Sequence, residues 1–460
     1  MAADVELTER IKAYAREAGF DVVGVARAAP FPDDRRVTQE RIAAGHYSGL
    51  PWFTAERAAF SSDPRNLLPT ARSIISLAMS YRPAGVPIAG EVGKPGAPRG
   101  RVSAYAWGRD YHTVLKERME RVVAYIRDNC GPEQQARTLV DTARILDRAA
   151  ARRAGVGWVG KHTNLITKAA GSWVFLGEIL TELELAEDEP LRANCGSCDL
   201  CLRACPTGAI VAPYVVESNR CISYLTIEHR GIIPRELRPL MGAWIFGCDI
   251  CQEVCPPNRR PGAPAHSEFR PAVTLLPMYN PTGSVVSPGS AAASPLTVQP
   301  APGARQHADS ILSRRQDAAP DDAGGPSLAT PELIPLLGIS QEEFTRRFGK
   351  TPVKRAKREG LQRNVAIALG NSGDPAAVPA LAHALEEAAP LVRAHAAWAL
   401  GRLGGPAAAQ ALHGTLSREN DETVREELEA ALAVCRRERN DGVHDWGVAV
   451  GVGRPAPVHA

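Results

Sequence analysis

Eight of the ten cysteines lie between residues 195 and 255, in two groups that each end in Cys-Pro. The first group reads Cys195-x-x-Cys198-x-x-Cys201-x-x-x-Cys205-Pro206, and the second reads Cys221, then Cys248-x-x-Cys251-x-x-x-Cys255-Pro256. Three cysteines separated by pairs of residues let one loop reach three corners of a [4Fe–4S] cube, while the cysteine before proline leads to another cube. The pattern therefore predicts a small domain, residues 191–260, that two clusters hold together.

In proteins with this spacing, the cysteine before each proline binds the cluster held mainly by the other group, so each cluster has four cysteine ligands. We expect one cluster to be held by Cys195, Cys198, Cys201 and Cys255, and the other by Cys205, Cys221, Cys248 and Cys251. Two structural zinc sites are the alternative, because paired CxxC units also suit tetrahedral zinc. Zinc does not call for a tight triplet followed by Cys-Pro, so the ferredoxin-like interpretation is favoured. The remaining cysteines, Cys130 and Cys435, are expected to be ordinary thiols.

Composition divides the rest of the chain into four parts. Residues 1–190 mix short apolar runs with helical stretches, which predicts an α/β (α+β) catalytic domain. Residues 261–330 are rich in Pro, Ala, Gly and Ser and are expected to be a flexible linker. Within residues 331–437, RNVAIALGNSGDPAAVPALAHAL aligns with RAHAAWALGRLGGPAAAQALHGTL, which predicts HEAT-like helical repeats. Residues 438–460 are expected to be a disordered tail.

No apolar run reaches the ~18 residues that a membrane helix needs, and the N-terminus has no signal-peptide pattern. We therefore expect a cytoplasmic protein. In that reducing compartment clustered cysteines are more often metal ligands than disulfides. The formal net charge is only +3, so a nucleic-acid partner has to be argued from local charge.

Four features together resemble the epoxyqueuosine reductase family. They are VDTARILDRAAARRAGVGWVGKHTNLI at 140–166, the cysteine layout, RCISYLTIEHRG at 220–231 and RNVAIALGNSGD at 363–374. The resemblance covers most of residues 1–260 and the repeats, but not the linker. It implies an iron–sulfur oxidoreductase of tRNA modification that uses base-off cobalamin. Such an enzyme removes the epoxide oxygen of epoxyqueuosine at the tRNA wobble position, giving queuosine and water.

The resemblance also implies roles for single residues. Asp141 matches the proton donor of the family, although an aspartate before a helical run can equally be an N-cap. Cobalamin contacts are implied for Asp110, Tyr111, His112, Lys161, Asn164, Thr167 and Ser223. Each of these could instead be a polar residue of the surface or of a helix end. The segment Phe60-Ser61-Ser62-Asp63-Pro64 lacks an arginine that the family usually has, which puts a cofactor contact from this segment in doubt.

The stretch from Arg346 to Arg363 is rich in Lys and Arg and could attract RNA phosphates, or it could be a solvated helix face. With the family as a guide, tRNA contacts are expected from Glu228, His229, Arg230, Lys354, Arg355, Arg358 and Arg363. The expected partners are a tRNA anticodon stem-loop and an unidentified low-potential electron donor, with the chain acting as a monomer. Two other functions stay open: a cobalamin-dependent reductive dehalogenase, and a ferredoxin-type electron carrier with an interaction domain.

Overall fold

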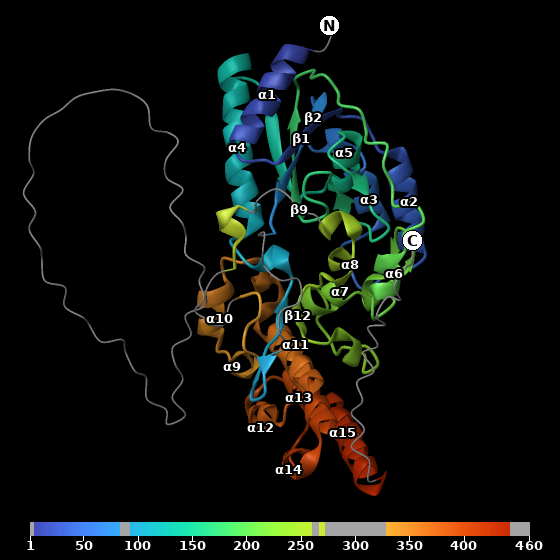
Figure 1. Ribbon diagram of the computed structural model, residues 1–460, viewed down its shortest axis with the longest axis vertical. Coiled ribbons are helices and arrows are strands. Elements are labelled where there is room, and N and C mark those ends of the chain that lie inside the picture. Colours follow the sequence, from blue (N-terminus) through green and yellow to red (C-terminus); the bar gives the residue numbers. More distant parts are fainter. Residues whose placement is uncertain (1–3, 83–92, 260–265, 272–327, 442–460) are drawn as a thin grey trace, which may run out of the picture.

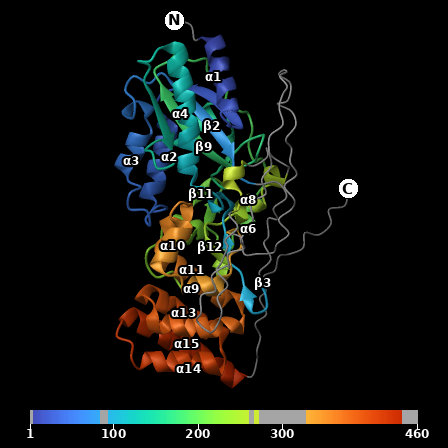
Figure 2. The same cartoon turned by 90° about the vertical axis from the view of Figure 1, so that its left-hand side faces the viewer.

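The computed structural model describes residues 4–82, 93–259, 266–271 and 328–441. Figures 1 and 2 show an elongated molecule with an α/β domain at one end, the cysteine domain in the middle and a helical repeat domain at the other end. This order in space follows the order in sequence. Among the described residues, no helix is both long enough and apolar enough to cross a lipid bilayer.

The α/β domain is built on a four-stranded antiparallel sheet. Its strand order is β1 (Val22–Arg27), β2 (Ser73–Ser80), β9 (Val174–Thr181) and β6 (Ala136–Val140). Short apolar runs near residues 21, 73 and 172 form β1, β2 and β9. Every residue of β2 is buried, which explains why its sequence is a continuous apolar run broken only by serine.

Helices cover both faces of this sheet. α1 (Val5–Glu17) and α4 (Tyr111–Cys130) pack on the face that carries Ile75 and Leu77. α5 (Asp147–Arg153) packs on the opposite face with Ile74, and α2 (Pro32–Ala43) and α3 (Ala55–Ser61) lie nearby (Figure 1). Alternate side chains of a strand point to opposite faces, so neighbouring isoleucines of β2 serve two different cores.

The cysteine domain consists of short elements joined by turns. They are α6 (Leu200–Ala204), β10 (Ile210–Ala212), β11 (Val215–Val216), α7 (Ile222–Ile227), β12 (Trp244–Phe246) and α8 (Ile250–Glu253). β12 pairs in parallel with β5 (Arg101–Val102) of the α/β domain. Asn258 adds a second connection, because its side-chain amide donates to Ser172 Oγ at 2.8 Å and accepts from the Ser172 amide at 2.7 Å. The two domains therefore share a hydrogen-bonded boundary.

The repeat domain contains α9 (Leu333–Leu337), α10 (Gln341–Phe348), α11 (Lys357–Ser372), α12 (Val378–Glu387), α13 (Pro390–Leu403), α14 (Gly405–Leu416) and α15 (Glu422–Asp441). The aligned glycines explain the repeat. A Cβ on Gly370 of α11 would lie 2.9 Å from Ala399 of α13, and a Cβ on Gly401 of α13 would lie 2.7 Å from Ala431 of α15. Each glycine thus lets one helix approach the equivalent helix of the next repeat. The HEAT-like architecture is confirmed.

Two pieces of the range that was predicted to be a linker are packed against the α/β domain. Glu268 accepts a hydrogen bond from Arg118 Nη2 at 2.6 Å, and the carbonyl of Ala329 accepts from the Val102 amide at 3.1 Å. Residues 266–271 and 328–330 of that range are therefore folded, because charged and backbone partners on the α/β domain hold them. The other residues of that range and residues 442–460 of the predicted tail lie outside the described residues.

Candidate active site

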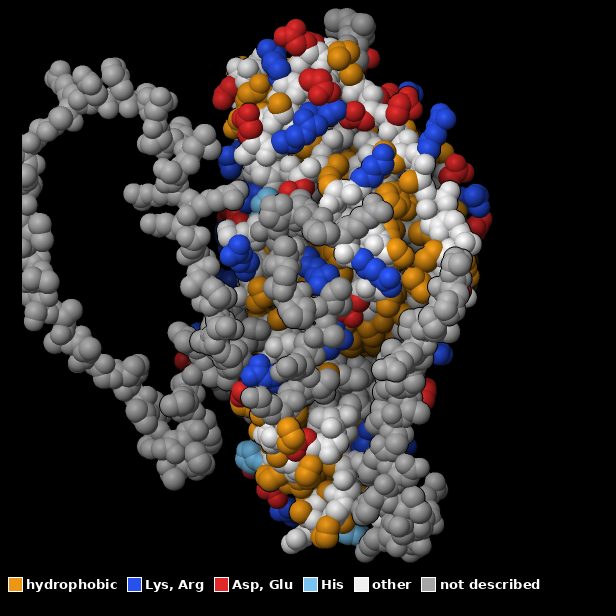
Figure 3. Space-filling view, in the orientation of Figure 1, with side chains coloured by type: hydrophobic (Ala, Val, Ile, Leu, Met, Phe, Trp, Pro, Cys, Tyr) orange, Lys and Arg blue, Asp and Glu red, His pale blue; other side chains and the backbone are white. Residues whose placement is uncertain are grey.

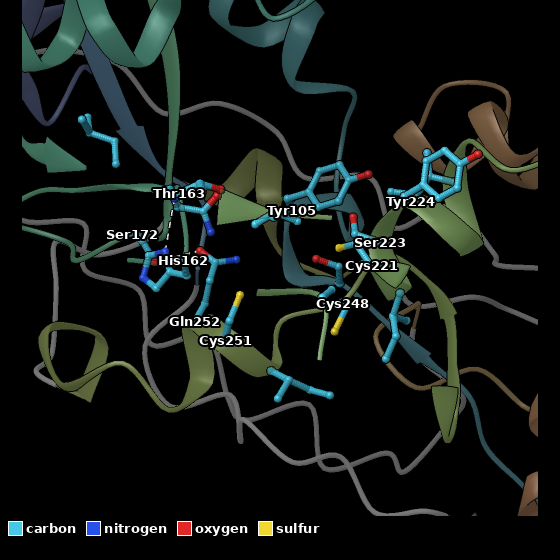
Figure 4. Close-up of a pocket in the computed structure, with 18 of the residues that line it drawn as sticks. Tyr105, His162, Thr163, Ser172, Cys221, Ser223, Tyr224, Cys248, Cys251 and Gln252 are labelled. Atoms are coloured by element: carbon cyan, nitrogen blue, oxygen red, sulfur yellow. Dashed lines mark hydrogen bonds between the residues drawn. The ribbon is translucent and has the colours of Figure 1, made fainter. Parts of the chain in front are cut away.

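A cavity of about 580 Å³ opens where the α/β domain meets the cysteine domain (Figure 4). The α/β domain lines it with polar and aromatic groups, among them Tyr105, Tyr111, Asp141, His162 and Phe175. The cysteine domain lines it with Cys205, Cys221, Ser223, Cys248 and Cys251. The volume is in the range of cavities that hold small molecules and cofactors. The cavity therefore brings thiols together with groups that can move protons.

Asp249 holds one cysteine loop at the cavity wall. This residue is buried between Cys248 and Cys251, and its carboxylate accepts from Ser103 Oγ at 2.5 Å and from the Ala104 amide at 2.7 Å. Gln252 accepts from Ser172 Oγ at 2.9 Å on the same side. Because all three donors belong to the α/β domain, the loop that carries the thiols is fixed relative to the cavity.

None of the eight clustered cysteines, all of which the structure describes, forms a disulfide. Burial, together with the neighbouring Cys195, Cys201 and Cys198, raises the pKa of Cys255 to about 12. Burial also raises the pKa of Cys251 well above the usual value, with contributions from Cys221, Cys201 and Cys205. Because such effects weaken with distance, the thiols of each expected ligand set lie near one another.

The grouping of the thiols fits the expected clusters chemically. Burial, Cys221 and Cys251 raise the pKa of Cys248, and Cys205 contributes to the raised pKa of Cys221, so these four thiols lie close enough to influence one another. Buried thiols with raised pKa values lose their protons readily only when a metal centre binds the sulfur in place of the proton. Among the described residues, no three His, Cys, Asp or Glu side chains are arranged to hold a single metal ion. The side chains grouped here are thiols, which are the ligands that [4Fe–4S] clusters use.

The two thiol groups differ in their distance from the cavity. Cys205, Cys221, Cys248 and Cys251 line it, whereas Cys195, Cys198, Cys201 and Cys255 do not. The influence of Cys201 on the pKa of Cys251 shows that the groups are neighbours. This arrangement suits electrons that enter at the outer group and leave from the inner group into the cavity.

Asp141 stands at the cavity edge in an unusual backbone conformation. It directly follows β6 and has φ of 29°, a region that residues other than glycine rarely adopt. Its Oδ2 accepts from the Tyr111 hydroxyl at 2.5 Å and lies 3.5 Å from His112 Nε2. α5 begins only at Asp147, with Leu146 at its N-cap position, so Asp141 does not cap a helix. The N-cap alternative is therefore wrong.

The protonation of this group is set by opposing effects. Desolvation by the surrounding protein raises the pKa of Asp141, but the nearby His112 ring and the hydrogen bond from Tyr111 outweigh it and leave the pKa below the usual value. Burial lowers the pKa of His112, but its hydrogen bond to Asp110 and the nearby carboxylate of Asp141 raise it to about 9. At neutral pH, in this state, the proton is therefore on His112 and Asp141 is a carboxylate.

The residues that the sequence assigned to cobalamin separate into two sets. Tyr111, Asn164 and Ser223 line the cavity. Asp110, His112, Lys161 and Thr167 do not line it.

The second set has protein partners. Asp110 caps α4 and accepts from Lys354 Nζ at 2.7 Å. Lys161 Nζ donates to the carbonyls of Gly196 and Cys198 at 2.7 and 2.8 Å, and Thr167 donates to the Gly171 carbonyl. These contacts shape the protein around the cavity, so a direct cofactor contact is not what the geometry favours for them. The segment 60–64 also supplies no lining residue.

The residues assigned to tRNA gather where residues 228–230 meet the repeat domain. Glu228 lines the cavity and pairs with Arg355, while Arg230 donates to the carbonyls of Ala356 and Arg355. His229 Nε2 donates to the Ile232 carbonyl, 3.0 Å away. Arg358 is partly exposed. Figure 3 shows basic and acidic side chains interspersed over the α/β domain, so no single charged field dominates that face.

Arg363 requires a correction. Its side chain is fully buried, and its guanidinium donates to the carbonyls of Leu225, His229 and Gly231. A phosphate cannot reach it there. Arg363 instead ties α11 of the repeat domain to the 225–231 segment of the cysteine domain.

Several cavity residues had no signal in the sequence. His162, Arg148, Tyr105 and Gln252 come from different segments, and only the fold brings them to one wall. His162 and Arg148 do lie within the block 140–166 that carried the family resemblance, so that block was the nearest available indication.

One thiol group lines the cavity and a second group lies behind it, while Asp141 and Tyr111 line the side formed by the α/β domain, with His112 next to Asp141. These features define an iron–sulfur oxidoreductase with room for another redox cofactor. Sequence models of three families match the chain: "4Fe-4S double cluster binding domain" over 194–258, "Epoxyqueuosine reductase QueG, DUF1730" over 62–142 and "HEAT repeats" over 354–433.

The epoxyqueuosine reductase of Escherichia coli is 34% identical over 394 residues, which cover 86% of this chain and 89% of that protein. A crystal structure of epoxyqueuosine reductase with an epoxyqueuosine-modified tRNA-Tyr stem loop matches with a TM-score of 0.76 at 30% identity. That match covers 94% of this chain and 99% of the other. A Bacillus subtilis structure, with its catalytic aspartate loop swung out of the active site, matches with a TM-score of 0.75 at 30% identity. Its match covers 93% and 99% of the two chains.

The chain belongs to the epoxyqueuosine reductase family, and it is an oxidoreductase. Its cofactors are cobalamin and two [4Fe–4S] clusters.

Proposed function

We propose that the cavity reduces the epoxide of epoxyqueuosine in the anticodon loop of tRNA, giving queuosine and water. The observation that carries this proposal is the meeting of one thiol group and Asp141 in a single cavity. The similar structure that holds an epoxyqueuosine-modified stem loop supports the choice of substrate. In the overall reaction two electrons and two protons are consumed, both carbon–oxygen bonds of the epoxide break, and a carbon–carbon double bond forms.

The electrons come from an external low-potential donor and pass through the two clusters. We assign Cys195, Cys198, Cys201 and Cys255 to the outer cluster and Cys205, Cys221, Cys248 and Cys251 to the inner one. Cobalamin, when bound, supplies the strongly reducing centre that opens the epoxide. Tyr111, Asn164 and Ser223 are the residues of the expected set that are available to contact it, since they line the cavity.

Asp141 delivers a proton to the epoxide oxygen in this proposal. Filling the cavity removes water from its carboxylate, which raises the pKa of the carboxyl. The proton then moves from His112 Nε2, 3.5 Å away, onto Asp141, while the Tyr111 hydroxyl holds the carboxylate in place. The relative whose catalytic aspartate loop can swing out supports a mobile role for the loop that carries Asp141.

The proposed RNA contacts are those at the cavity mouth. Glu228 lines the cavity, Arg230 contacts the backbone of Arg355 and Ala356, and Lys354, Arg355 and Arg358 belong to the repeat domain. Lys354 and Arg355 already pair with Asp110 and Glu228, so an RNA phosphate would have to compete with these carboxylates. A tRNA substrate and cysteines that form no disulfides among the described residues support a cytoplasmic enzyme, and we propose that it acts as a monomer.

The test is anaerobic reconstitution with iron, sulfide and cobalamin, followed by mass analysis of nucleosides from tRNA that carries epoxyqueuosine. We expect queuosine to form with the native chain. Asp141→Asn should keep both cofactors and lose at least ~100-fold in single-turnover rate, as removal of a general acid does. An unchanged rate in this variant would remove Asp141 from the mechanism. Halide release from a halogenated phenol, without queuosine, would favour the dehalogenase function.

A further inference from the structure

His162 is a buried histidine, and only one of its two ring nitrogens has a hydrogen-bond partner. It lines the cavity and is 4% exposed. Its Nδ1 accepts from the backbone amide of Asn164 at 3.2 Å, a bond that places the ring proton on Nε2. Nε2 has no partner among the described residues. A buried donor without an acceptor is costly, so such a group usually indicates a missing partner.

Another buried histidine of the chain shows the ordinary arrangement. His395 in α13 is fully buried, with Nδ1 at 2.7 Å from the Leu391 carbonyl and Nε2 accepting from the Ile233 amide at 3.2 Å. Both of its nitrogens are paired within the protein. Burial alone therefore does not leave a histidine of this chain with an unpaired nitrogen. The unpaired Nε2 of His162 goes with its position in the cavity wall.

The imidazole of His162 is also held in place. A Cβ on Gly160 would lie 2.9 Å from its Cε1, so the ring packs directly against the backbone at Gly160. Burial lowers the pKa of His162 to about 4, which keeps the ring neutral at physiological pH. Figure 4 shows His162 on the cavity wall with Thr163 and Ser172. The side chain is thus a rigid, uncharged donor.

We propose that His162 donates a hydrogen bond from Nε2 to a side-chain amide carbonyl of bound cobalamin, and that it does not ligate cobalt. Ligation would need a lone pair, but Nδ1 is taken by the Asn164 amide and Nε2 carries the proton. The corrin ring is fringed by amides whose carbonyl oxygens accept such bonds. The adjacent lining residues Thr163 and Asn164 add polar groups to the same wall.

This inference shares with the proposed function only the assumption that cobalamin is the cofactor bound in the cavity. The test is a titration of cobalamin, followed by absorbance, into anaerobic protein that carries both clusters and no RNA. His162→Leu removes the donor at similar volume, and His162→Gln restores an N–H donor. Leucine should weaken cobalamin binding about 10-fold, the equivalent of ~1.4 kcal/mol for one lost hydrogen bond, while glutamine should recover most of the loss.

Iron content and the thermal midpoint confirm that each variant is folded. His395→Leu is the matched control, and it should lower the thermal midpoint without changing cobalamin affinity. If His162→Leu binds cobalamin as tightly as the native chain, the proposed contact is refuted. Electron paramagnetic resonance of bound Co(II) gives an independent check, because hyperfine splitting from an axial nitrogen that disappears in His162→Leu would also refute it. Failure of the proposed function would show differently, as absence of queuosine with the native chain.

Discussion

Replacement of His112 by asparagine tests how the cavity obtains its proton. His112 Nδ1 lies 2.8 Å from Asp110 and its Nε2 lies 3.5 Å from Asp141, so the ring connects a fixed carboxylate to the one at the cavity. Asparagine keeps a polar group at this position but cannot carry the proton. General acid catalysis contributes 10²–10⁴-fold in rate. Because Tyr111 still holds Asp141, we expect the lower end, a loss of about 100-fold or ~2.7 kcal/mol.

The dependence of the rate on pH provides a second test of the role of His112. The pKa of His112 is raised to about 9, so the ring is charged below that pH and loses its proton as pH rises through it. The single-turnover rate of the native chain should therefore fall above about pH 9, and this fall should be absent in His112→Asn. Rapid-quench assays of queuosine formation, with cobalamin and both clusters loaded, measure both quantities.

His46 provides the control for this experiment. Its Nδ1 also contacts a carboxylate, Glu217 Oε2 at 3.0 Å, but it does not line the cavity. His46→Asn should leave the rate and its pH profile unchanged. A rate within threefold of native in His112→Asn, or an unaltered alkaline fall, would show that the proton comes by another route.

Three further predictions concern the framework around the cavity. Glu427 of α15 is 4% exposed and pairs with the fully buried Arg238 at 2.7 Å, so Glu427→Gln should lower the free energy of unfolding by about 3–5 kcal/mol in denaturant titrations. The exposed Glu426→Gln is its control, and equal stability of the two variants would contradict the account. Gly401→Ala should cost about 1–3 kcal/mol through the 2.7 Å approach to Ala431, whereas Gly414→Ala, with nothing within 4 Å, should be neutral or stabilising. Lys161→Met removes the bonds to the Gly196 and Cys198 carbonyls, so iron should be lost faster under air than in the exposed Lys168→Met, with cobalamin affinity unchanged. If Lys161→Met instead lost cobalamin affinity and kept its iron, Lys161 would have to contact the cofactor directly.

The strands of the α/β domain and the repeat helices could be predicted because their signals are local. A short apolar run such as the one at residue 73 is typical of a buried strand, and the aligned glycines of the repeats mark the same close helix contact twice. The cysteine spacing likewise reflects the shape of a cluster that one loop must wrap.

The contacts made by single charged side chains could not be predicted in the same way. Arg363 belongs to a basic run, but its partners are carbonyls of residues 225–231, which the chain brings to it from more than a hundred positions away. Lys161 likewise finds its acceptors in the cysteine loop. A charge run in a sequence is compatible with solvent, RNA or buried carbonyls, and only the tertiary contacts decide among them.

The central claim is that electrons pass from the thiol-held clusters into the cavity and are used there to remove the epoxide oxygen. The most direct test is to reduce the reconstituted protein chemically, remove the reductant, and add epoxyqueuosine-containing tRNA without oxygen. Cluster oxidation is followed by absorbance, and nucleosides are measured by mass spectrometry. The account predicts two electrons withdrawn from the protein for each queuosine formed. Clusters that stay reduced while queuosine appears, or that oxidise without any queuosine, would contradict it.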